Sequence, residues 1–432
     1  MRVLIIGSGG REHCLAWKLN SGSDISRIYA IPGNPGISQI GECKNITPSK
    51  ENFKLISDFV AEENIDFTVV GPEAPLVDGI VDYFQSRGQA IFGPNLSAAR
   101  LEGSKVFTKQ LCLKYGIPTA ESIKFERPDY DMAAEYIKKL GRNNFPIVLK
   151  VDGLAAGKGV IIAESEKDAL LELENCFIGN VFGDAGDSII IEKFISGFEV
   201  SLLNLCDGNS IIPMVLAQDY KKIFDNDEGK NTGGMGSYSP VPFVDQILYK
   251  KMLEEIIYPT YDAILKEGID YRGVLYGGII VSDGQPYLLE YNCRFGDPET
   301  QAILPMLDND LLELMVKCAA GKLGNSALNW DGSKCVCVVL ASRGYPESSS
   351  KNDQINGLDY FADNNDAMVF HAGTKSENSK IYTNGGRVLG VVSKAASFRH
   401  ARNLAYSAVS RISFDGMQYR KDIAKRVEEE IS

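Results

Sequence analysis

A glycine-rich loop with one lysine separates two apolar runs in the stretch IVLKVDGLAAGKGVIIAE, residues 147–164. A Walker phosphate-binding loop needs the spacing G-x-x-x-x-G-K-[ST] and leads into a helix. Here Gly153, Gly157 and Lys158 leave that spacing one residue short, and Gly159 stands where the hydroxyl should be. Both flanks are rich in β-branched residues and predict two strands joined by a mobile loop. The question is which anion a lysine in a loop between two strands would bind.

Two oxygen-bearing side chains alternate in the later apolar run YLLEYN, residues 287–292. Strand positions two apart share one face and lie roughly 7 Å from each other, so we expect Leu288, Glu290 and Asn292 to point the same way. Mg²⁺ accepts an incomplete set of protein oxygens and completes its octahedron with water and phosphate oxygens. Taken alone, the pair is more typical of a solvated polar edge than of a metal site.

The next segment, CRFGDPETQ, places Arg294 and Asp297 in a turn that glycine and proline constrain. The planar fork of arginine matches a carboxylate or a phosphate with two parallel hydrogen bonds. A surface loop can have the same composition, but the position directly after the two oxygen ligands favours a functional site.

Two lysines stand at positions that are unfavourable without an anion. Lys105 lies in the first turn of a predicted helix, SKVFTKQLCLKYG, where the helix dipole disfavours a cation. Lys150 ends an apolar strand, where a charge is costly unless it has a partner. A bound anion would reverse both penalties.

The run IIIEKFISGFEVSL offers Glu192 at a strand end and Glu199 seven residues later. Backbone groups beside such a strand could pair with an adenine edge, and a carboxylate could accept from ribose hydroxyls. Two ordinary surface glutamates remain an alternative. The glycines around Met235, in NTGGMGSYSP, favour a loop that approaches a ligand closely, although a flexible connector is also possible.

Histidine chemistry has little support, because the chain has three histidines and only His13 lies near a proposed site. Lysines, carboxylates, an arginine and glycine loops remain, and these are typical of phosphoryl transfer by positioning and charge neutralisation.

These residues need elements that hold them. Residues 1 to about 95 alternate apolar strands with helical patterns, which predicts an open parallel sheet covered by helices. Ligands of such sheets lie at the carboxyl ends of strands, which here read GSGGRE, PGNPG and GPEAP. A nicotinamide fingerprint would need a third glycine where Glu12 stands, so a phosphosugar fits these turns better than a dinucleotide.

With 432 residues the chain should hold about three domains. The predicted boundaries are 1–103 for the α/β domain, 104–327 for a middle domain whose mobile-loop unit covers about 120–190, and 328–432 for a strand-rich domain. Within the middle domain, Asp283 and Gly284 predict a tight hairpin turn.

The amino-acid composition argues against several classes of protein. Lys and Arg number 45 and Asp and Glu 57, so the formal charge of −12 disfavours nucleic acid and anionic membrane surfaces as partners. Nine cysteines without paired C-x-x-C spacing indicate neither a disulfide framework nor a zinc knuckle. No run approaches the ~18 apolar residues of a membrane span. We expect a soluble protein in the reducing cytoplasm.

Taken together, the segments resemble the ATP-grasp ligases and, within them, the glycinamide ribonucleotide synthetase family. The resemblance is carried by VLIIGSGGREH, PGNPG, VVGPEAPL, FGP, LEGSK, KVDGLAAGKGV, NTGGMGSYSP, EYNCRFGDPETQ, HAGT and TNGGRVL, in that order over nearly the whole chain. It implies an α/β and α+β multidomain protein with three parts: an N-terminal Rossmann-like open parallel sheet, an ATP-grasp core with a mobile lid, and a small β-rich C-terminal domain.

The resemblance also implies roles for residues. Those expected to hold ATP are Lys105, Lys150, Gly157, Lys158, Glu192 and Glu199, with Lys158 on the lid. Glu290 and Asn292 would bind Mg²⁺ or Mn²⁺. Arg294 and Lys158 would take part in catalysis, with Arg294 facing the glycine carboxylate or its acyl phosphate. Those expected to hold substrates are Gly9, Arg11, Asn34, Glu73, Asp219, Arg294 and Asp297.

The implied activity joins glycine to 5-phosphoribosylamine through glycyl phosphate, in a monomer or weak dimer with a single activity. Another ATP-grasp carboxylate-amine ligase and a non-catalytic nucleotide-binding regulator are the alternatives. Two positions depart from the usual family pattern: Tyr220 stands where histidine is usual, and Val151 stands where alanine is usual. The first could alter a hydrogen bond on the substrate side.

Overall fold

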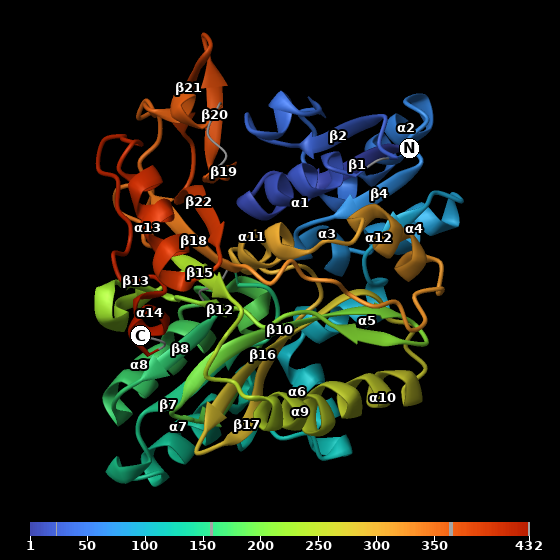
Figure 1. Cartoon of the computed structure of the whole chain (residues 1–432). Coiled ribbons are helices and arrows are strands. Elements are labelled where there is room, and N and C mark those ends of the chain that lie inside the picture. Colours follow the sequence, from blue (N-terminus) through green and yellow to red (C-terminus); the bar gives the residue numbers. More distant parts are fainter. Residues whose placement is uncertain (23, 156–158, 363–365, 431–432) are drawn as a thin grey trace.

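The computed structural model describes residues 1–22, 24–155, 159–362 and 366–430. Figure 1 shows three groups of elements: an N-terminal group at the upper right, a C-terminal group at the upper left, and a middle group that fills the lower half. The mixed α/β and α+β class that the sequence predicts is confirmed.

The N-terminal group is a five-stranded parallel sheet. In spatial order its strands are β3 (Glu42–Cys43), β2 (Arg27–Pro32), β1 (Arg2–Gly7), β4 (Phe67–Val70) and β5 (Ile91–Phe92). The helices of this segment are α1 (Gly10–Asn20), α2 (Phe53–Glu62), α3 (Glu73–Val77), α4 (Ile80–Ser86) and α5 (Leu96–Gly103). Residues 3–6 are fully buried, as both faces of a parallel sheet require. The predicted open parallel sheet is confirmed.

The middle group contains two antiparallel sheets. The first has the order β6 (Ser122–Glu126), β9 (Ser188–Lys193), β7 (Ile147–Val151) and β8 (Val160–Ala163). The second has the order β11 (Ile211–Pro213), β10 (Phe198–Asp207), β16 (Arg272–Ser282) and β17 (Gln285–Asn292). Asp283 and Gly284 join β16 to β17 with φ of 50° and 73°, the left-handed pair that a two-residue hairpin turn needs.

Helices of the middle group cover these sheets. They are α6 (Lys105–Tyr115), α7 (Tyr130–Lys139), α8 (Glu166–Phe177), α9 (Gln246–Met252), α10 (Tyr258–Lys266), α11 (Glu299–Ile303) and α12 (Leu311–Ala319), with one π-helical turn at Leu253–Ile257. As predicted, Ser104 caps the N-terminus of α6, where its Oγ accepts from the N–H of Phe107, and Gly116 with φ of 69° caps the C-terminus.

The C-terminal group is built on a third sheet, in the order β12 (Gln218–Asp219), β15 (Gly236–Ser239), β18 (Lys334–Ala341), β22 (Arg387–Ala395) and β19 (Met368–His371). Two hairpins, β13 (Lys222–Phe224) with β14 (Glu228–Asn231) and β20 (Thr374–Glu377) with β21 (Lys380–Thr383), and the helices α13 (Phe398–Val409) and α14 (Lys425–Glu430) complete the chain. Because β12 and β15 come from before residue 328, this sheet crosses the predicted boundary between residues 327 and 328. The boundaries stay predictions.

The hydrophobic cores separate one unit from the rest. Leu149, Leu173 and Ile191 belong to a core confined to residues 125–191, between the β6–β9–β7–β8 sheet and the helices α7 and α8. Another core joins Ile5 of β1 to residues of the middle and C-terminal groups, including Val339 of β18. The unit predicted as a lid therefore has its own core, whereas the other groups share theirs.

Candidate active site

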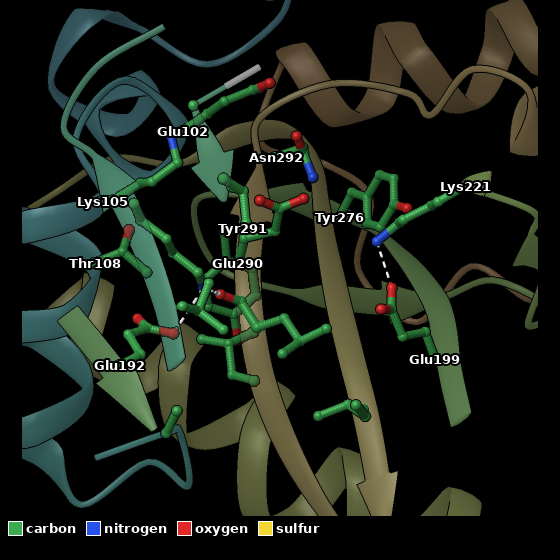
Figure 2. Close-up of a pocket in the computed structure, with 18 of the residues that line it drawn as sticks. Glu102, Lys105, Thr108, Glu192, Glu199, Lys221, Tyr276, Glu290, Tyr291 and Asn292 are labelled. Carbon is green, nitrogen blue, oxygen red and sulfur yellow. Dashed lines mark hydrogen bonds and ion pairs between the residues drawn. The ribbon is translucent and has the colours of Figure 1, made fainter. Parts of the chain in front are cut away.

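A cavity of about 340 Å³ lies between the two antiparallel sheets of the middle group (Figure 2). Lys150 reaches it from β7, Glu290 from β17, and Arg294 from the turn after β17. The predicted site residues in its wall are Glu73, Lys105, Lys150, Glu192, Glu199, Asp219, Glu290, Asn292, Arg294 and Asp297. The structure thus brings into one space groups that lie far apart in the sequence.

Lys150 shares a carboxylate with a second buried lysine. Glu192, on β9, has Oε2 at 2.9 Å from Nζ of Lys150 and Oε1 at 2.8 Å from Nζ of Lys109 on α6. All three residues are at most 8% exposed. The contact to Lys109 lacks hydrogen-bond geometry, so Oε1 keeps its capacity to accept from a ligand. Lys109 is a lysine of the cavity wall that the sequence interpretation missed, although it lies four positions after Lys105 on one helix face.

Lys105 lies at the start of α6, close to the base of the glycine-rich loop. Its Nζ donates to the carbonyl of Gly153 at 3.1 Å, which leaves two N–H groups for another acceptor. Asp152 accepts from the backbone N–H of Val106 at 3.1 Å through Oδ1. These bonds connect the helix start to the chain that follows β7. Gly157 and Lys158 lie outside the described residues, so their roles stay predictions.

On the opposite side of the cavity, Lys221 forms an ion pair with Glu199 (Figure 2). Burial lowers the pKa of Lys221, but the carboxylates of Glu199, Asp219 and Glu290 outweigh it and raise the pKa well above its ordinary value. The lysine is therefore charged across the neutral range. The sequence interpretation missed Lys221, although it stands two positions after Asp219 in a short extended segment.

Glu290 and Asn292 lie between Lys105 on one side and Lys221 on the other (Figure 2). They oppose Gly278 and Tyr276 of β16, two register positions apart, next to a β-bulge. Burial raises the pKa of Glu290, but four nearby cations, led by Lys221, outweigh it and hold the pKa below its ordinary value.

This pair fits a hard divalent cation. The Glu290 carboxylate makes no hydrogen bond or ion pair with any residue that the structure describes. Asn292 Oδ1 accepts one hydrogen bond, from Arg294 at 3.1 Å, and an amide oxygen has a second lone pair. Two protein oxygens facing an open cavity are the incomplete set that Mg²⁺ or Mn²⁺ can complete with phosphate and water. Within the described ranges, no cluster of three His, Cys, Asp or Glu forms a complete metal site.

Arg294 joins the N-terminal group to the cavity. Its Nε lies 3.2 Å from Oε2 of Glu73 on α3, and its Nη2 lies 3.0 Å from Oε1 of Glu102 on α5. Glu102, which the sequence interpretation missed, also accepts from the backbone N–H of Cys293 at 2.7 Å. Burial raises the pKa of Glu102 even though the arginine opposes it. Arg294 is thus held in place by carboxylates, one on each side.

Asp219 and Glu299 form an acidic end of the cavity. Burial raises the pKa of Asp219 to about 7, with Lys221 opposing the shift and Glu299 adding to it. Glu299 accepts from the hydroxyls of Tyr276 and Ser201. The acidic end therefore changes its charge within the physiological pH range.

Three predicted substrate residues of the N-terminal loops are not in the cavity wall. Arg11 donates to the carbonyl of Phe295 at 3.0 Å, directly after Arg294. Asn34 donates to the carbonyl of His371 at 2.8 Å and so connects the N-terminal loop to β19. Both side chains hold neighbouring segments together in this structure, and their roles toward a substrate stay predictions.

Gly9, the third of these residues, approaches Asp297 closely: a Cβ at this position would lie 3.3 Å from Oδ2 of Asp297. The same Oδ2 lies 3.3 Å from Nη2 of Arg387 at the start of β22. Arg387 also donates to the carbonyl of Gly233 at 2.6 Å, in the predicted close-approach loop. The sequence interpretation missed Arg387, although it lies in the quoted motif TNGGRVL.

Tyr220, the departure from the family pattern, is not in the cavity wall. Its hydroxyl accepts from the backbone N–H of Ala424 at 3.0 Å, and the guanidinium of Arg420 lies 4.6 Å from its ring centroid. The tyrosine therefore contacts the C-terminal segment. Its effect on a hydrogen bond at the substrate side stays a prediction.

No helix in the part of the chain that the structure describes is long and apolar enough to cross a membrane. All nine cysteines are free thiols.

Three family models match the chain, all of phosphoribosylglycinamide synthetase. The N domain matches residues 1–102, the ATP-grasp (A) domain residues 103–300, and the C domain residues 335–426. A phosphoribosylamine–glycine ligase of Caldanaerobacter subterraneus is 46% identical over 424 residues, which cover 98% of this chain and 99% of the relative. The enzyme of that name from Neisseria meningitidis serogroup B is 46% identical over 433 residues, with 99% of each chain covered.

Solved structures agree with this result. The phosphoribosylamine–glycine ligase of Thermotoga maritima is similar with a TM-score of 0.83 and 33% identity, over 98% of this chain and 100% of that one. The biotin carboxylase domain of 2-oxoglutarate carboxylase from Hydrogenobacter thermophilus, solved with MgADP and bicarbonate, has a TM-score of 0.73 over 97% of this chain and 91% of that one. At 17% identity it shows the fold alone. The resemblance seen in the sequence is confirmed, and the chain belongs to the phosphoribosylglycinamide synthetase family.

Proposed function

We propose that this protein is the ATP-dependent ligase that joins glycine to 5-phospho-D-ribosylamine through glycyl phosphate. The products are glycinamide ribonucleotide, ADP and phosphate, and the reaction is a step of purine biosynthesis. The relatives named above carry the name of this activity over essentially their whole length. The observation that carries the proposal is that Lys150, Glu290 and Arg294 open onto one cavity.

The cavity suits a reaction that brings several negative oxygens together. Two like charges 4 Å apart repel by about 4 kcal/mol at an effective dielectric constant near 20. Bringing a carboxylate to a triphosphate therefore requires fixed positive charge, which Lys105, Lys150 and Lys221 supply from different walls of the cavity. Because each lysine is held by protein contacts before a ligand arrives, little reorganisation is needed during the reaction.

ATP and a divalent cation, Mg²⁺ or Mn²⁺, supply the phosphoryl group and the charge neutralisation that make the glycine carboxyl reactive. Lys105 and Lys150 would hold phosphate oxygens with their remaining N–H groups. Glu290 and Asn292 would hold the cation. Glu192, at 3% exposure, and Glu199 would accept from the base or the ribose, from opposite sides of the cavity.

Arg294 would bind the glycine carboxylate. Its guanidinium already contacts two carboxylates, Glu73 and Glu102, and Glu73 is the more exposed partner. An incoming carboxylate can replace Glu73 without leaving the arginine unpaired. The loops of Gly9 and Arg11 adjoin this position and would hold the phosphoribosylamine together with Asp297.

The proposal is tested with purified protein, ATP, Mg²⁺, glycine and freshly prepared phosphoribosylamine, by following ADP release in a coupled assay. We expect ADP release that needs both glycine and the amine, with one glycinamide ribonucleotide formed per ADP. ADP release with another acid or amine but not with these substrates would favour a different ATP-grasp carboxylate-amine ligase. A cytoplasmic location and a monomer or weak dimer complete the proposal.

The raised pKa of Asp219 predicts a pH-dependent stability. A carboxyl whose pKa rises from 3.8 to about 7 on folding contributes stability that is fully present below about pH 4 and is lost as the pH rises through about 7. We therefore expect Asp219→Asn to stabilise the protein at pH 8 by at least about 1.4 kcal/mol, the equivalent of one pKa unit. Urea denaturation at pH 5 and pH 8 measures this.

Asp262→Asn, on the exposed face of α10, is the matched control. It should leave the free energy of unfolding unchanged at both pH 5 and pH 8. An equal shift for Asp219→Asn at both pH values would show that the carboxyl is not the cause.

A further inference from the structure

Lys109 is a buried lysine beside the proposed nucleotide site to which the proposed reaction gives no role. It lies on α6 and is 8% exposed. Its Nζ donates to Oγ1 of Thr119 at 2.7 Å and to the carbonyl of Ala120 at 3.1 Å, and it lies 2.8 Å from Oε1 of Glu192. These three protein oxygens surround the ammonium group. Although Lys109 lines the cavity, its ammonium group is thus placed to hold Glu192.

Thr119 extends this contact to the second sheet. Its hydroxyl donates to the carbonyl of Leu288 on β17 at 2.8 Å, and the backbone N–H of Leu288 donates to the carbonyl of Pro118 at 2.8 Å. Lys109 is therefore fixed from α6, from the chain before β6 and from β17. These contacts hold the positive charge of Lys109 at a defined distance from the carboxylate of Glu192.

Lys150 has a different set of contacts. Its Nζ donates to the carbonyl of Leu289 at 2.9 Å and lies 2.9 Å from Oε2 of Glu192, which leaves one N–H free. Glu192 is the carboxylate that both lysines share. Two lysines and one glutamate give this triad a net charge of +1. Lys150, with its free N–H, is the member of the triad that can donate to a phosphate.

We propose that Lys109 is a positioning residue: it balances the charge of Glu192, so that Lys150 keeps an uncompensated positive charge and a free N–H for the phosphates of ATP. The inference rests on the proposed binding of ATP in this cavity. It assigns the discrimination between phosphorylated and unphosphorylated adenosine to a residue that does not contact the nucleotide.

Removal of the Lys109 charge should weaken phosphate binding selectively. Without Lys109, the charge of Glu192 is balanced by Lys150 alone, and the triad becomes neutral. Loss of one unit charge near a triphosphate should lower the affinity for ATP about tenfold, which is about 1.4 kcal/mol. Adenosine lacks phosphates, so its affinity should change by less than about twofold.

The experiment measures dissociation constants for ATP and for adenosine by calorimetry, without turnover, in wild type and Lys109→Met. We expect the ratio of the two constants to shift about tenfold against ATP. Lys109→Gln, which keeps a donor for Thr119 but lacks the charge, should give the same shift and serves if the methionine variant fails to fold. In Lys109→Met/Glu192→Gln the ratio should return to within about threefold of wild type, because no carboxylate is left for Lys150 to balance.

Lys114→Met is the matched control, because Lys114 lies on the same helix, is exposed and pairs with Glu267. It should leave both constants unchanged. A wild-type ratio in folded Lys109→Met or Lys109→Gln overturns the inference, and so does an equal loss for ATP and adenosine, or a double variant without recovery. If the wild-type protein binds no ATP, the proposed function itself fails, and this result is distinct from the others.

Discussion

Glu290→Gln is expected to lower the turnover number by about 10²–10³-fold while the protein stays folded. Glutamine keeps the size of the side chain but removes the charge that a divalent cation needs. Because nearby cations hold the pKa of Glu290 below its ordinary value, loss of its charge should lower the free energy of unfolding at neutral pH. The carboxylate has no hydrogen-bond or ion-pair partner within the described chain, so no direct partner is left unpaired and the protein should still fold. The coupled assay for ADP release, together with urea denaturation, measures both quantities.

The matched control is Glu254→Gln, which removes an exposed carboxylate that forms an i,i+4 ion pair with Lys250. Its turnover should equal that of wild type. If Glu290→Gln kept more than about a tenth of the wild-type turnover at saturating Mg²⁺, Glu290 would not be the metal ligand. Partial recovery at higher cation concentration would agree with a weakened metal site.

Much of the fold could be predicted from local patterns. The apolar run VLIIG predicts a buried parallel strand because every residue in it is apolar, and β1 is buried on both faces. The turn at Asp283 and the caps of α6 also follow from single residues. The pairing of β12 and β15 with the C-terminal sheet could not be predicted, because strands of two to four residues carry little periodicity and find their partners through tertiary contacts.

The candidate site divides in a similar way. Motifs led to residues at glycine-rich turns and at strand ends, such as Lys150, Glu290 and Arg294, and these do line one cavity. Lys109 and Glu102 were missed because each lies in the middle or at the end of a helix, where nothing local separates a buried charged side chain from an exposed one. Their partners are 83 and 192 residues away in sequence, as the pairs with Glu192 and Arg294 show.

The same long-range pairs explain how the site depends on the arrangement of the domains. Glu73 belongs to the segment that matches the N domain, and Arg294 to the segment that matches the ATP-grasp domain. Arg387 adds the segment that matches the C domain through its contact with Asp297. The charge balance of the cavity is therefore completed only when all three segments are packed together.

Arg294→Met is expected to abolish activity and to destabilise the protein by about 3 kcal/mol at pH 8. Methionine leaves the carboxylate of Glu102, which is 9% exposed, without its partner. Burial already raises the pKa of Glu102, and loss of the arginine raises it further. A raised pKa means that stability is present at low pH and is lost as the pH rises, so the defect should shrink toward pH 5. Urea denaturation between pH 5 and pH 8 measures it.

Two further variants separate the buried charge from the size of the side chain. Arg294→Met/Glu102→Gln should regain much of the lost stability at pH 8, because no unpaired buried charge remains, yet it should stay inactive if Arg294 binds the glycine carboxylate. Arg343→Met removes an exposed arginine paired with Asp415 and should cost less than about 1 kcal/mol. A pH-independent loss of stability in Arg294→Met would contradict the role of the arginine charge in pairing with Glu102. Activity in the double variant would contradict its role in binding the glycine carboxylate.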